Sequence, residues 1–441
     1  MLYNYLSYGS LQNPNDLSET FYENCTKLPN SHYIKLSVPD CQLTIKKYYD
    51  IDWTNVNHSI TISEAKEKFH ELFYTSINRR LRSDVAVGSS LSGGLDSSLI
   101  VTVIDELIKG NGQKQSTFSA VFPGFEKDER KYMDYVITKT NVSPHFITSG
   151  ADGLINDIDK LSWHQEEPYE SASIYAQYCV MRIAKENNIK VLLDGQGADE
   201  VLAGYHSYYL NYFNELRQSN FSLYKKELSA YSIMHKGNKI NDNITTGLFN
   251  KIKMKAGNYT PVLRKWYHQY KQLKKPFLNK DFYKEYRKES FQPIPATKNL
   301  NHSLYNSIMQ QGLQELLRYA DRNSMAYGRE IRLPFLYHEL VEFLMTLPPQ
   351  MKINQGWTKW IMRTTFETEL PNEICWRKDK IGYEPPQQNW MQKDKVKEKI
   401  IEAKNTLIDN NILIKTKPKQ KAIANNEKDN WAFWMASQLL K

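Results

Sequence analysis

Cysteine is scarce in this chain, and long apolar runs are missing. The four cysteines among 441 residues, Cys25, Cys41, Cys179 and Cys375, stand far apart and form no CxxC pair. Neither a disulfide framework nor a zinc site is therefore expected. No stretch reaches the roughly 20 consecutive apolar residues that a bilayer span needs, and the first residues lack the pattern of a signal peptide. The sequence predicts a cytoplasmic protein with no membrane partner.

Positive charge is in excess, with a formal net charge of +9. Much of the excess lies between Lys225 and Lys288, where Lys alternates with Tyr, Phe and Trp. Such interleaving can stack and neutralise single-stranded nucleic acid. Amphipathic helices with solvated Lys faces explain the same pattern. We favour the helices, and expect no nucleic-acid partner.

The length exceeds what one hydrophobic core usually spans, so an appendage or a second domain is expected. Residues 1–57 contain alternating runs, HYIKLSV and QLTIKKYYDI, that predict strands. From Ile62 the apolar residues recur at helical spacing, with Ser63 placed to cap the helix. We therefore predict a short N-terminal part, 1–57, and a main domain, 58–441.

Strand and helix patterns alternate in the first half of the main domain. The run DVAVGSSLSGGLDSSLIVTVIDELI reads as strand, turn and helix. Strands are predicted at 116–122, at 145–148 and from Lys190, and helices at 128–138 and 171–187. Such alternation predicts a doubly wound α/β fold with a parallel sheet. After Gly204 the pattern is nearly all helical.

A Ser/Gly loop, Ser90–Ser98, joins a predicted strand to a predicted helix. Glycines let the backbone approach an anion, and the helix N-terminus behind them offers free N–H groups. Asp96 supplies a hard oxygen ligand for Mg²⁺. No Lys follows the glycines, so this is not the P-loop of kinases. The residues expected at phosphate are Ser92, Gly93, Gly94, Ser97 and Ser98.

A second glycine turn, in Leu192–Tyr205, carries an acidic pair after another apolar strand. Carboxyl ends of strands in open α/β sheets bind ligands, so Asp199 and Asp96 are expected to share Mg²⁺. Capping of the following helix by Asp199 and Glu200 is the alternative explanation.

The string SGGLDSS is similar to the pyrophosphate-binding loop of N-type ATP pyrophosphatases. With DGQGADEVLAGY, YADRNSMAYGREIRLPFL, GWTKWIMR and RKDKIGYEPP in this order, the chain resembles the synthetase domain of glutamine-dependent asparagine synthetases from Ile60 to Lys441. The resemblance implies an adenine nucleotide alpha hydrolase-like fold, with ATP and Mg²⁺ as cofactors. It also implies a ligase that adenylates a carboxylate, most simply that of the aspartate side chain, and amidates it with ammonia.

The resemblance also implies roles for particular residues. Leu91 and Val121 match residues that flank adenine and ribose, and Gly195 belongs to the nucleotide site. Lys359 matches a lysine that stabilises the pentavalent phosphorus, and Glu167, beside Glu166, matches the glutamate that accepts a proton from ammonia. Framework or substrate-pocket roles are implied for Arg322, Arg329, Glu330 and Arg332.

Two departures from the family pattern affect function. Residues Leu2–Tyr49 resemble only the end of a glutaminase domain, and no cysteine follows Met1. We therefore expect a fragment, or ammonia from solution or from a separate glutaminase chain. Gln196 and Tyr337 stand where the family carries acidic residues, so a uronic acid of a surface polysaccharide precursor competes with aspartate as substrate. A tRNA-modifying ATP pyrophosphatase and a non-catalytic partner protein are further alternatives. The protein could also form a homodimer.

Overall fold

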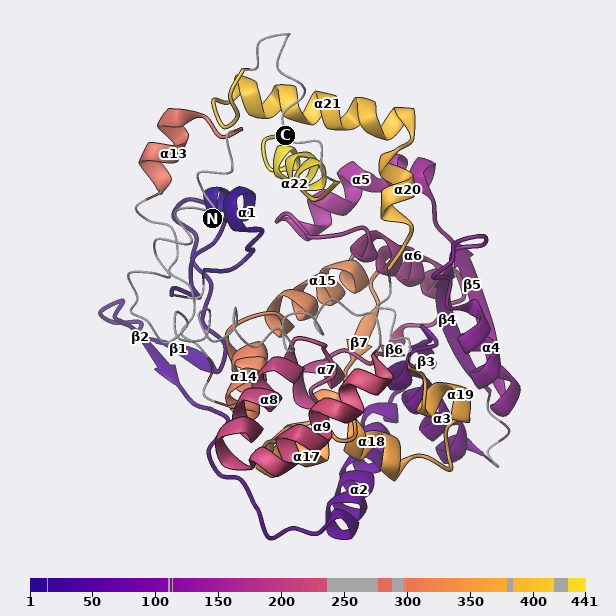
Figure 1. The fold of residues 1–441 in the computed structure, drawn as a ribbon. Helices are drawn as coiled ribbons and strands as arrows, with labels where there is room; N and C mark the ends of the chain where they lie inside the picture. The colour runs from indigo at the N-terminus through magenta and orange to yellow at the C-terminus, as the bar shows by residue number, and fades with distance from the viewer. Residues whose placement is uncertain are drawn as a thin grey trace.

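Helices surround a five-stranded sheet (Figure 1). The computed structural model describes residues 1–13, 15–109, 112, 114–235, 277–287, 297, 299–378, 384–415 and 427–441. The strands stand in the order β5-β4-β3-β6-β7, and all neighbours are parallel. Their bounds are Val87–Ser90 for β3, Gln115–Val121 for β4, Val142–Thr148 for β5, Val191–Leu193 for β6 and Glu330–Arg332 for β7.

Two hydrophobic cores lie on opposite faces of this sheet. Along β4, Val121 belongs to one core and Phe118 and Ala120 to the other, because successive side chains of a strand point to opposite faces. The first core includes side chains of α3 (Leu95–Ile108) and α4 (Arg130–Lys139), and the second those of α5 (Ala151–Gln165) and α6 (Ser173–Glu186). The predicted doubly wound α/β fold is confirmed.

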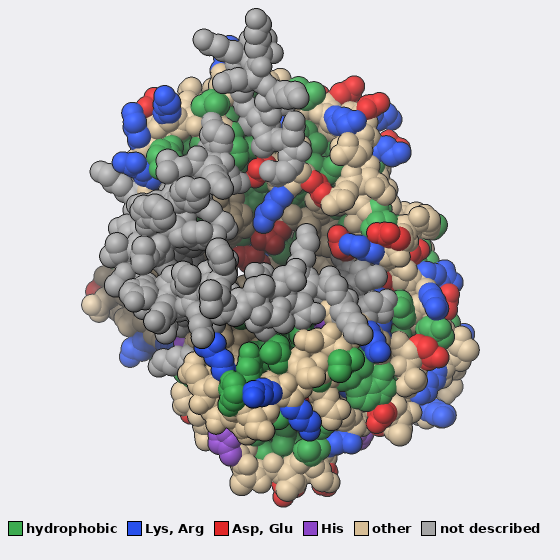
Figure 2. Space-filling view, viewed as in Figure 1, with side chains coloured by type: hydrophobic (Ala, Val, Ile, Leu, Met, Phe, Trp, Pro, Cys, Tyr) green, Lys and Arg blue, Asp and Glu red, His purple; other side chains and the backbone are tan. Residues whose placement is uncertain are grey.

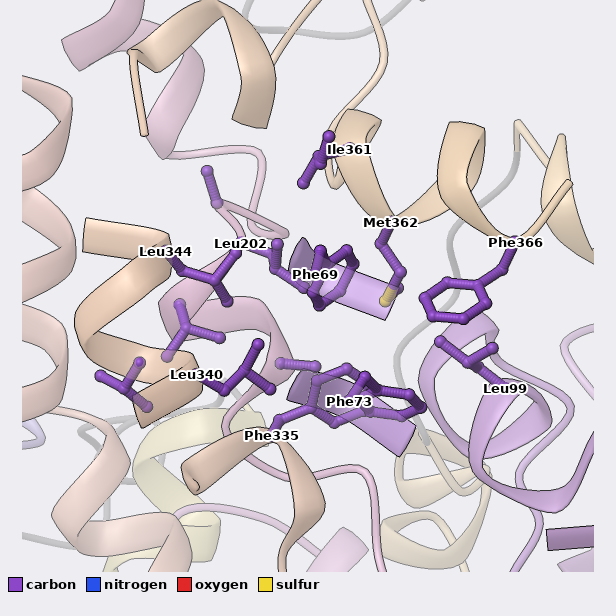
Figure 3. Close-up of a cluster of buried hydrophobic side chains, with 14 of the residues drawn as sticks. Phe69, Phe73, Leu99, Leu202, Phe335, Leu340, Leu344, Ile361, Met362 and Phe366 are labelled. Atoms are coloured by element: carbon purple, nitrogen blue, oxygen red, sulfur yellow. The ribbon is translucent and has the colours of Figure 1, made fainter. Parts of the chain in front are cut away.

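Helix α2 (Ile62–Leu81) packs aromatic side chains into the first core. Figure 3 shows Phe69 and Phe73 beside Phe335 and Phe366, and the ring centroids of Phe73 and Phe335 are 4.8 Å apart. These phenylalanines connect α2 to segments nearly three hundred residues further along the chain, which fixes the helix against the main domain.

The start of α2 corrects one prediction. Thr61, not Ser63, is the N-cap: its Oγ1 accepts from the Glu64 backbone N–H at 3.3 Å. Glu64 Oε2 in turn accepts from the Thr61 backbone N–H at 2.8 Å. This reciprocal pair needs a glutamate three residues after the cap, and the sequence has that spacing from Thr61.

The chain after Gly204 is mostly helical in its described parts, as predicted. Strand β7 is the exception, followed by a 3₁₀ turn at Pro334–Leu336. Most of the basic, aromatic region between Lys225 and Lys288 lies outside the described residues. The helices from the second glycine turn onward are α7 Ala198–Val201, α8 Tyr208–Ser219, α9 Phe221–Met234, α13 Lys280–Tyr286, α14 Leu300–Met309, α15 Leu313–Met325, α16 His338–Thr346, α17 Pro349–Lys352, α18 Trp360–Thr365, α19 Asn372–Cys375, α20 Gln387–Met391, α21 Asp394–Asp409 and α22 Glu427–Gln438.

The N-terminal part contains α1 (Leu2–Tyr8) and a hairpin of β1 (His32–Leu36) and β2 (Leu43–Lys47). Both strands were predicted, and they pair with each other in antiparallel register. Helix α1 packs against α22 near the C-terminus (Figure 1). The boundary at residue 57 stays a prediction.

Candidate active site at two glycine turns

The two glycine turns meet because their strands are neighbours in the sheet. Strand β4 pairs with one edge of β3, and β6 pairs with its other edge. The strand order therefore reverses between β3 and β6, and open α/β sheets bind ligands in the crevice at such a switch point. The turn at Ser90–Ser98 follows β3, and the turn at Asp194–Tyr205 follows β6.

A cavity of about 560 Å³ lies at this point. Both turns contribute to its wall, together with Lys359 from the segment before α18. The predicted site residues in the wall are Leu91, Ser92, Gly94, Asp96, Ser97, Gly195, Asp199 and Lys359.

The first turn is held in shape by its own serines. Ser97 Oγ accepts from the Ser92 backbone N–H at 3.2 Å and lies 3.0 Å from Ser92 Oγ. Gly93 has a φ of +76°, and a Cβ there would stand 2.9 Å from the Tyr132 Cβ. Glycine is therefore required for the turn to pack against α4, and the turn delivers the N-terminus of α3 to the cavity.

The second turn packs against the first at Gly195, with no room for a side chain between them. A Cβ on Gly195 would stand 2.9 Å from the Cβ of Asp96 and 3.2 Å from the backbone N of Ser97. Any larger residue would push the two turns apart. Gly195 therefore brings Asp199, on α7, into the same space as Asp96 on α3.

Lys359 lies between the two aspartates. Its Nζ donates to Asp96 Oδ1 and Oδ2, both at 2.6 Å, and forms an ion pair with Asp199 Oδ1 at 2.7 Å. The residue is only 2% exposed. Burial by itself would lower the pKa of Lys359, but the charges of Asp199 and Asp96 outweigh it and raise the pKa above its ordinary value. Both carboxylates thus reach a single cation.

Further charged residues in the wall were not assigned from the sequence. Arg363 donates from Nε to the Thr358 carbonyl at 2.9 Å, and Arg377 pairs with Glu129 at 2.7 Å. Both arginines stand inside motifs that matched the family, GWTKWIMR and RKDKIGYEPP, which was the available signal. Burial raises the pKa of Asp194, at the start of the second turn, although hydrogen bonds from Gly195 and Gln177 oppose this. The wall therefore combines several cations with buried carboxylates.

Some predicted site residues do not line the cavity. Val121 and Ser98 are buried in the protein interior, and Gly93 faces α4. Glu167 is buried and pairs with Arg318, with Lys27 Nζ at 4.0 Å, while Glu166 pairs with Arg322. Glu167 is thus paired with cations outside the cavity wall, and its role as proton acceptor stays a prediction.

The remaining family positions also make framework contacts. Arg329 donates to the Ile189 carbonyl at 2.7 Å, and Arg332 to the Arg80 carbonyl at 2.6 Å, which ties β7 to its surroundings. Glu330 accepts from Arg332 at 2.6 Å. Tyr337 is 5% exposed, with its hydroxyl bonded to Arg79 at 2.6 Å. Of the two substituted positions, the cavity wall contains Gln196 and not Tyr337.

A second acidic group lies behind one wall of the cavity. Tyr319 is in that wall, and its neighbour Glu315 is largely buried close to Glu170. Burial and the charge of Glu170 raise the pKa of Glu315 to about 8. Figure 2 shows acidic side chains gathered in a hollow near the middle of the molecular face. A carboxyl with this pKa is mostly protonated at neutral pH, so Glu315 adds little negative charge beside the cavity.

The match to known proteins agrees with this geometry. The asparagine synthase family model matches residues 68–440. The chain belongs to the asparagine synthase family. This confirms the resemblance carried by the five motifs, and with it an enzyme of the ligase class.

Curated relatives match similar shares of the chain. Glutamine-hydrolyzing asparagine synthetase 1 of Bacillus subtilis is 28% identical over 366 residues, which are 81% of this chain and 55% of that protein. A putative asparagine synthetase of Mycobacterium tuberculosis is 23% identical over 85% of this chain and 56% of its own length. The amidase chyE of Penicillium rubens is 22% identical over 85% of this chain and 60% of its own length. This chain thus spans about half the length of these curated relatives.

Two features are absent from the described residues. None of the described helices has the length and apolar character to cross a bilayer. Within the same ranges, His, Cys, Asp and Glu side chains form no group of three or more that could hold a metal ion. A cation bound to Asp96 and Asp199 would therefore need ligands other than these side chains, such as backbone carbonyls, water or phosphate oxygens.

Proposed function

We propose that this protein is an ATP-dependent amide ligase. It cleaves ATP between the α- and β-phosphates, transfers the adenylyl group to a carboxylate, and forms an amide with ammonia. One observation carries the proposal: two glycine turns at the switch point of the sheet bring Asp96 and Asp199 to a common cation, Lys359.

The residues present fit ATP and Mg²⁺. The first turn offers serine hydroxyls and the N-terminus of α3 to phosphate oxygens, which is the usual anion site of such a turn. Asp96 and Asp199 are hard oxygen ligands that already reach one cation, so together with phosphate oxygens they would hold Mg²⁺. The bound metal would offset the negative charge that develops on the departing pyrophosphate.

Lys359 stabilises the transfer step. Negative charge builds on the oxygens of the transferring phosphorus, and a cation already in place there favours the transition state over the ground state. Since Lys359 is almost fully buried, little water competes with it for those oxygens. Loss of this buried cation, which contacts both aspartates, is therefore expected to slow the transfer step.

The acceptor in this proposal is the side-chain carboxylate of aspartate, which would give asparagine. Gln196 in the cavity wall cannot supply the negative charge that glutamate would offer to an amino group, so a uronic acid is the competing acceptor. Relatives named as amidases match a similar share of this chain as the synthetases do. Ammonia comes from solution or from a separate glutaminase chain, and Glu167 is the predicted proton acceptor. The site of action is the cytoplasm.

The test is the identity of the nucleotide products. The protein is incubated with ATP, Mg²⁺, ammonium and either aspartate or glucuronic acid, and the products are separated by ion-exchange chromatography. We expect AMP and pyrophosphate in equal amounts, and only with the true acceptor. ADP would exclude the mechanism. The variant Gln196→Glu distinguishes the two acceptors further. If the amino group of aspartate contacts this side chain, the added negative charge should increase the activity with aspartate.

A further inference from the structure

Lys359 occupies the position that a cation bridging Asp96 and Asp199 would take. Its Nζ lies 2.6 Å from both Asp96 oxygens and 2.7 Å from Asp199 Oδ1. These are the same two carboxylates that the proposed function assigns to Mg²⁺. An ammonium group and a divalent ion cannot share that space, since like charges repel strongly in a buried site.

The backbone around Lys359 is shaped for this contact. Lys359 has φ 53° and ψ 34°, in the left-handed region that non-glycine residues rarely adopt. Such conformations persist where the surrounding structure enforces them, and they cluster at switch and ligand sites. The two aspartates hold the end of the side chain, and α18 begins immediately after it.

Gly204 makes room for the lysine and its partner. A Cβ on Gly204 would stand 1.8 Å from Asp199 Oδ1 and 2.3 Å from Lys359 Cε. No side chain fits there without displacing the ion pair. Gly204, the last glycine of DGQGADEVLAGY, is therefore a positioning residue for Lys359. The contacts described for it include neither Asp96 nor the first turn.

We propose that Lys359 is the resident counter-ion of Asp96 and Asp199, and that it yields this place to Mg²⁺ as the metal and nucleotide bind. The inference rests on the proposed function. The displaced ammonium then has the phosphate oxygens as its new partners, so it reaches the transferring phosphorus only when metal and nucleotide are both present. Free Mg²⁺ must displace Lys359 without offering it a new partner, and therefore binds weakly. Metal and nucleotide must by linkage strengthen each other's binding.

The test measures metal binding without turnover. Mn²⁺ is titrated into wild type and Lys359→Met, and free Mn²⁺ is followed by electron paramagnetic resonance. We expect Lys359→Met to bind Mn²⁺ alone about tenfold or more tightly than wild type, because two buried carboxylates lose their competing cation. Lys352→Met is the matched control, since Lys352 is also fully buried but contacts no carboxylate oxygen among its described hydrogen bonds, and its Mn²⁺ affinity should equal that of wild type.

Equal or weaker Mn²⁺ binding by Lys359→Met would overturn the inference. Circular dichroism checks that the variant is folded; should it not fold, Lys359→Gln is titrated in its place under the same criterion. Adding a non-hydrolysable ATP analogue separates the two proposals. If wild type binds Mn²⁺ with the analogue and forms AMP from ATP, but Lys359→Met gains no metal affinity, only this inference fails. If no protein binds Mn²⁺ with the analogue, the proposed function fails as well.

Discussion

Two buried lysines seven residues apart, Lys352 and Lys359, have pKa values shifted in opposite directions. Lys359 is 2% exposed and lies between Asp96 and Asp199. Lys352 is fully buried and donates to Asn301 Oδ1 at 2.6 Å and to the Leu347 carbonyl at 3.0 Å. The charges of the aspartates raise the pKa of Lys359, whereas burial lowers the pKa of Lys352 to about 7, with Glu215 opposing only in part.

The difference shows what a buried ammonium needs to stay charged. Neutral acceptors satisfy the hydrogen bonds of Lys352 but do not offset the free energy that its charge loses on leaving water. Two carboxylates do so for Lys359, which keeps a permanent cation in the proposed active site. Lys352, on α17, instead joins its helix to Asn301 on α14, a structural role that a neutral amine also performs.

The largest expected effect is a difference in catalytic activity between variants of the two lysines. Lys359→Met removes the only lysine in the described cavity wall, so we expect kcat/KM for pyrophosphate release to fall by about 10²–10³-fold, as for other single transition-state donors. Lys352→Met should stay close to wild type, because Lys352 is not in that wall. A coupled pyrophosphate assay measures both variants, and comparable losses in the two would break the comparison.

A second, smaller effect concerns stability and pH. The pKa of Lys352 is about 7 in the folded protein and near 10.4 in the unfolded chain, so the unfolded chain binds more protons between these values. The free energy of unfolding should therefore rise with pH in this window, by at most about 1.4 kcal/mol per pH unit. Below about pH 7 the contribution of Lys352 to the free energy of unfolding no longer changes with pH and has its least favourable value.

Lys352→Met should lack that slope. Urea unfolding at several pH values between the two pKa values measures the difference between wild type and variant. The comparison within each pH cancels the other titrating groups. Identical slopes for the two proteins would show that Lys352 keeps its charge on folding.

The smallest expected effect comes from Glu215, whose charge raises the pKa of Lys352 against burial. Glu215→Gln removes that charge while keeping an oxygen that can accept from the Leu300 N–H. We expect the window of rising stability to begin at lower pH, with a change below about 1 kcal/mol near neutral pH. The same unfolding series detects it, and a shift toward higher pH would contradict the assigned sign.

Local patterns were enough to predict the parallel sheet, the turn at Ser90–Ser98 and the turn before Asp199. Each depends on residues close together in the chain: apolar runs, glycines and a following helix. Strand β7 was not predicted because Glu330–Arg332 contains a single apolar residue, whereas the equally short β6 is apolar throughout. The cap of α2 was available in the spacing of Thr61 and Glu64 but was assigned to Ser63.

The sequence by itself determined the fold class, the family and the two turns that form the site, because these follow from local periodicity and from ordered motifs. Only the tertiary structure decided the partners of the charged side chains. Lys359 meets Asp96 across 263 positions of the chain, Glu167 pairs with Arg318, and Lys352 receives neutral acceptors instead of a carboxylate. Coulomb and desolvation energies depend on distance and burial in space, and neither is encoded in the spacing of residues along the chain.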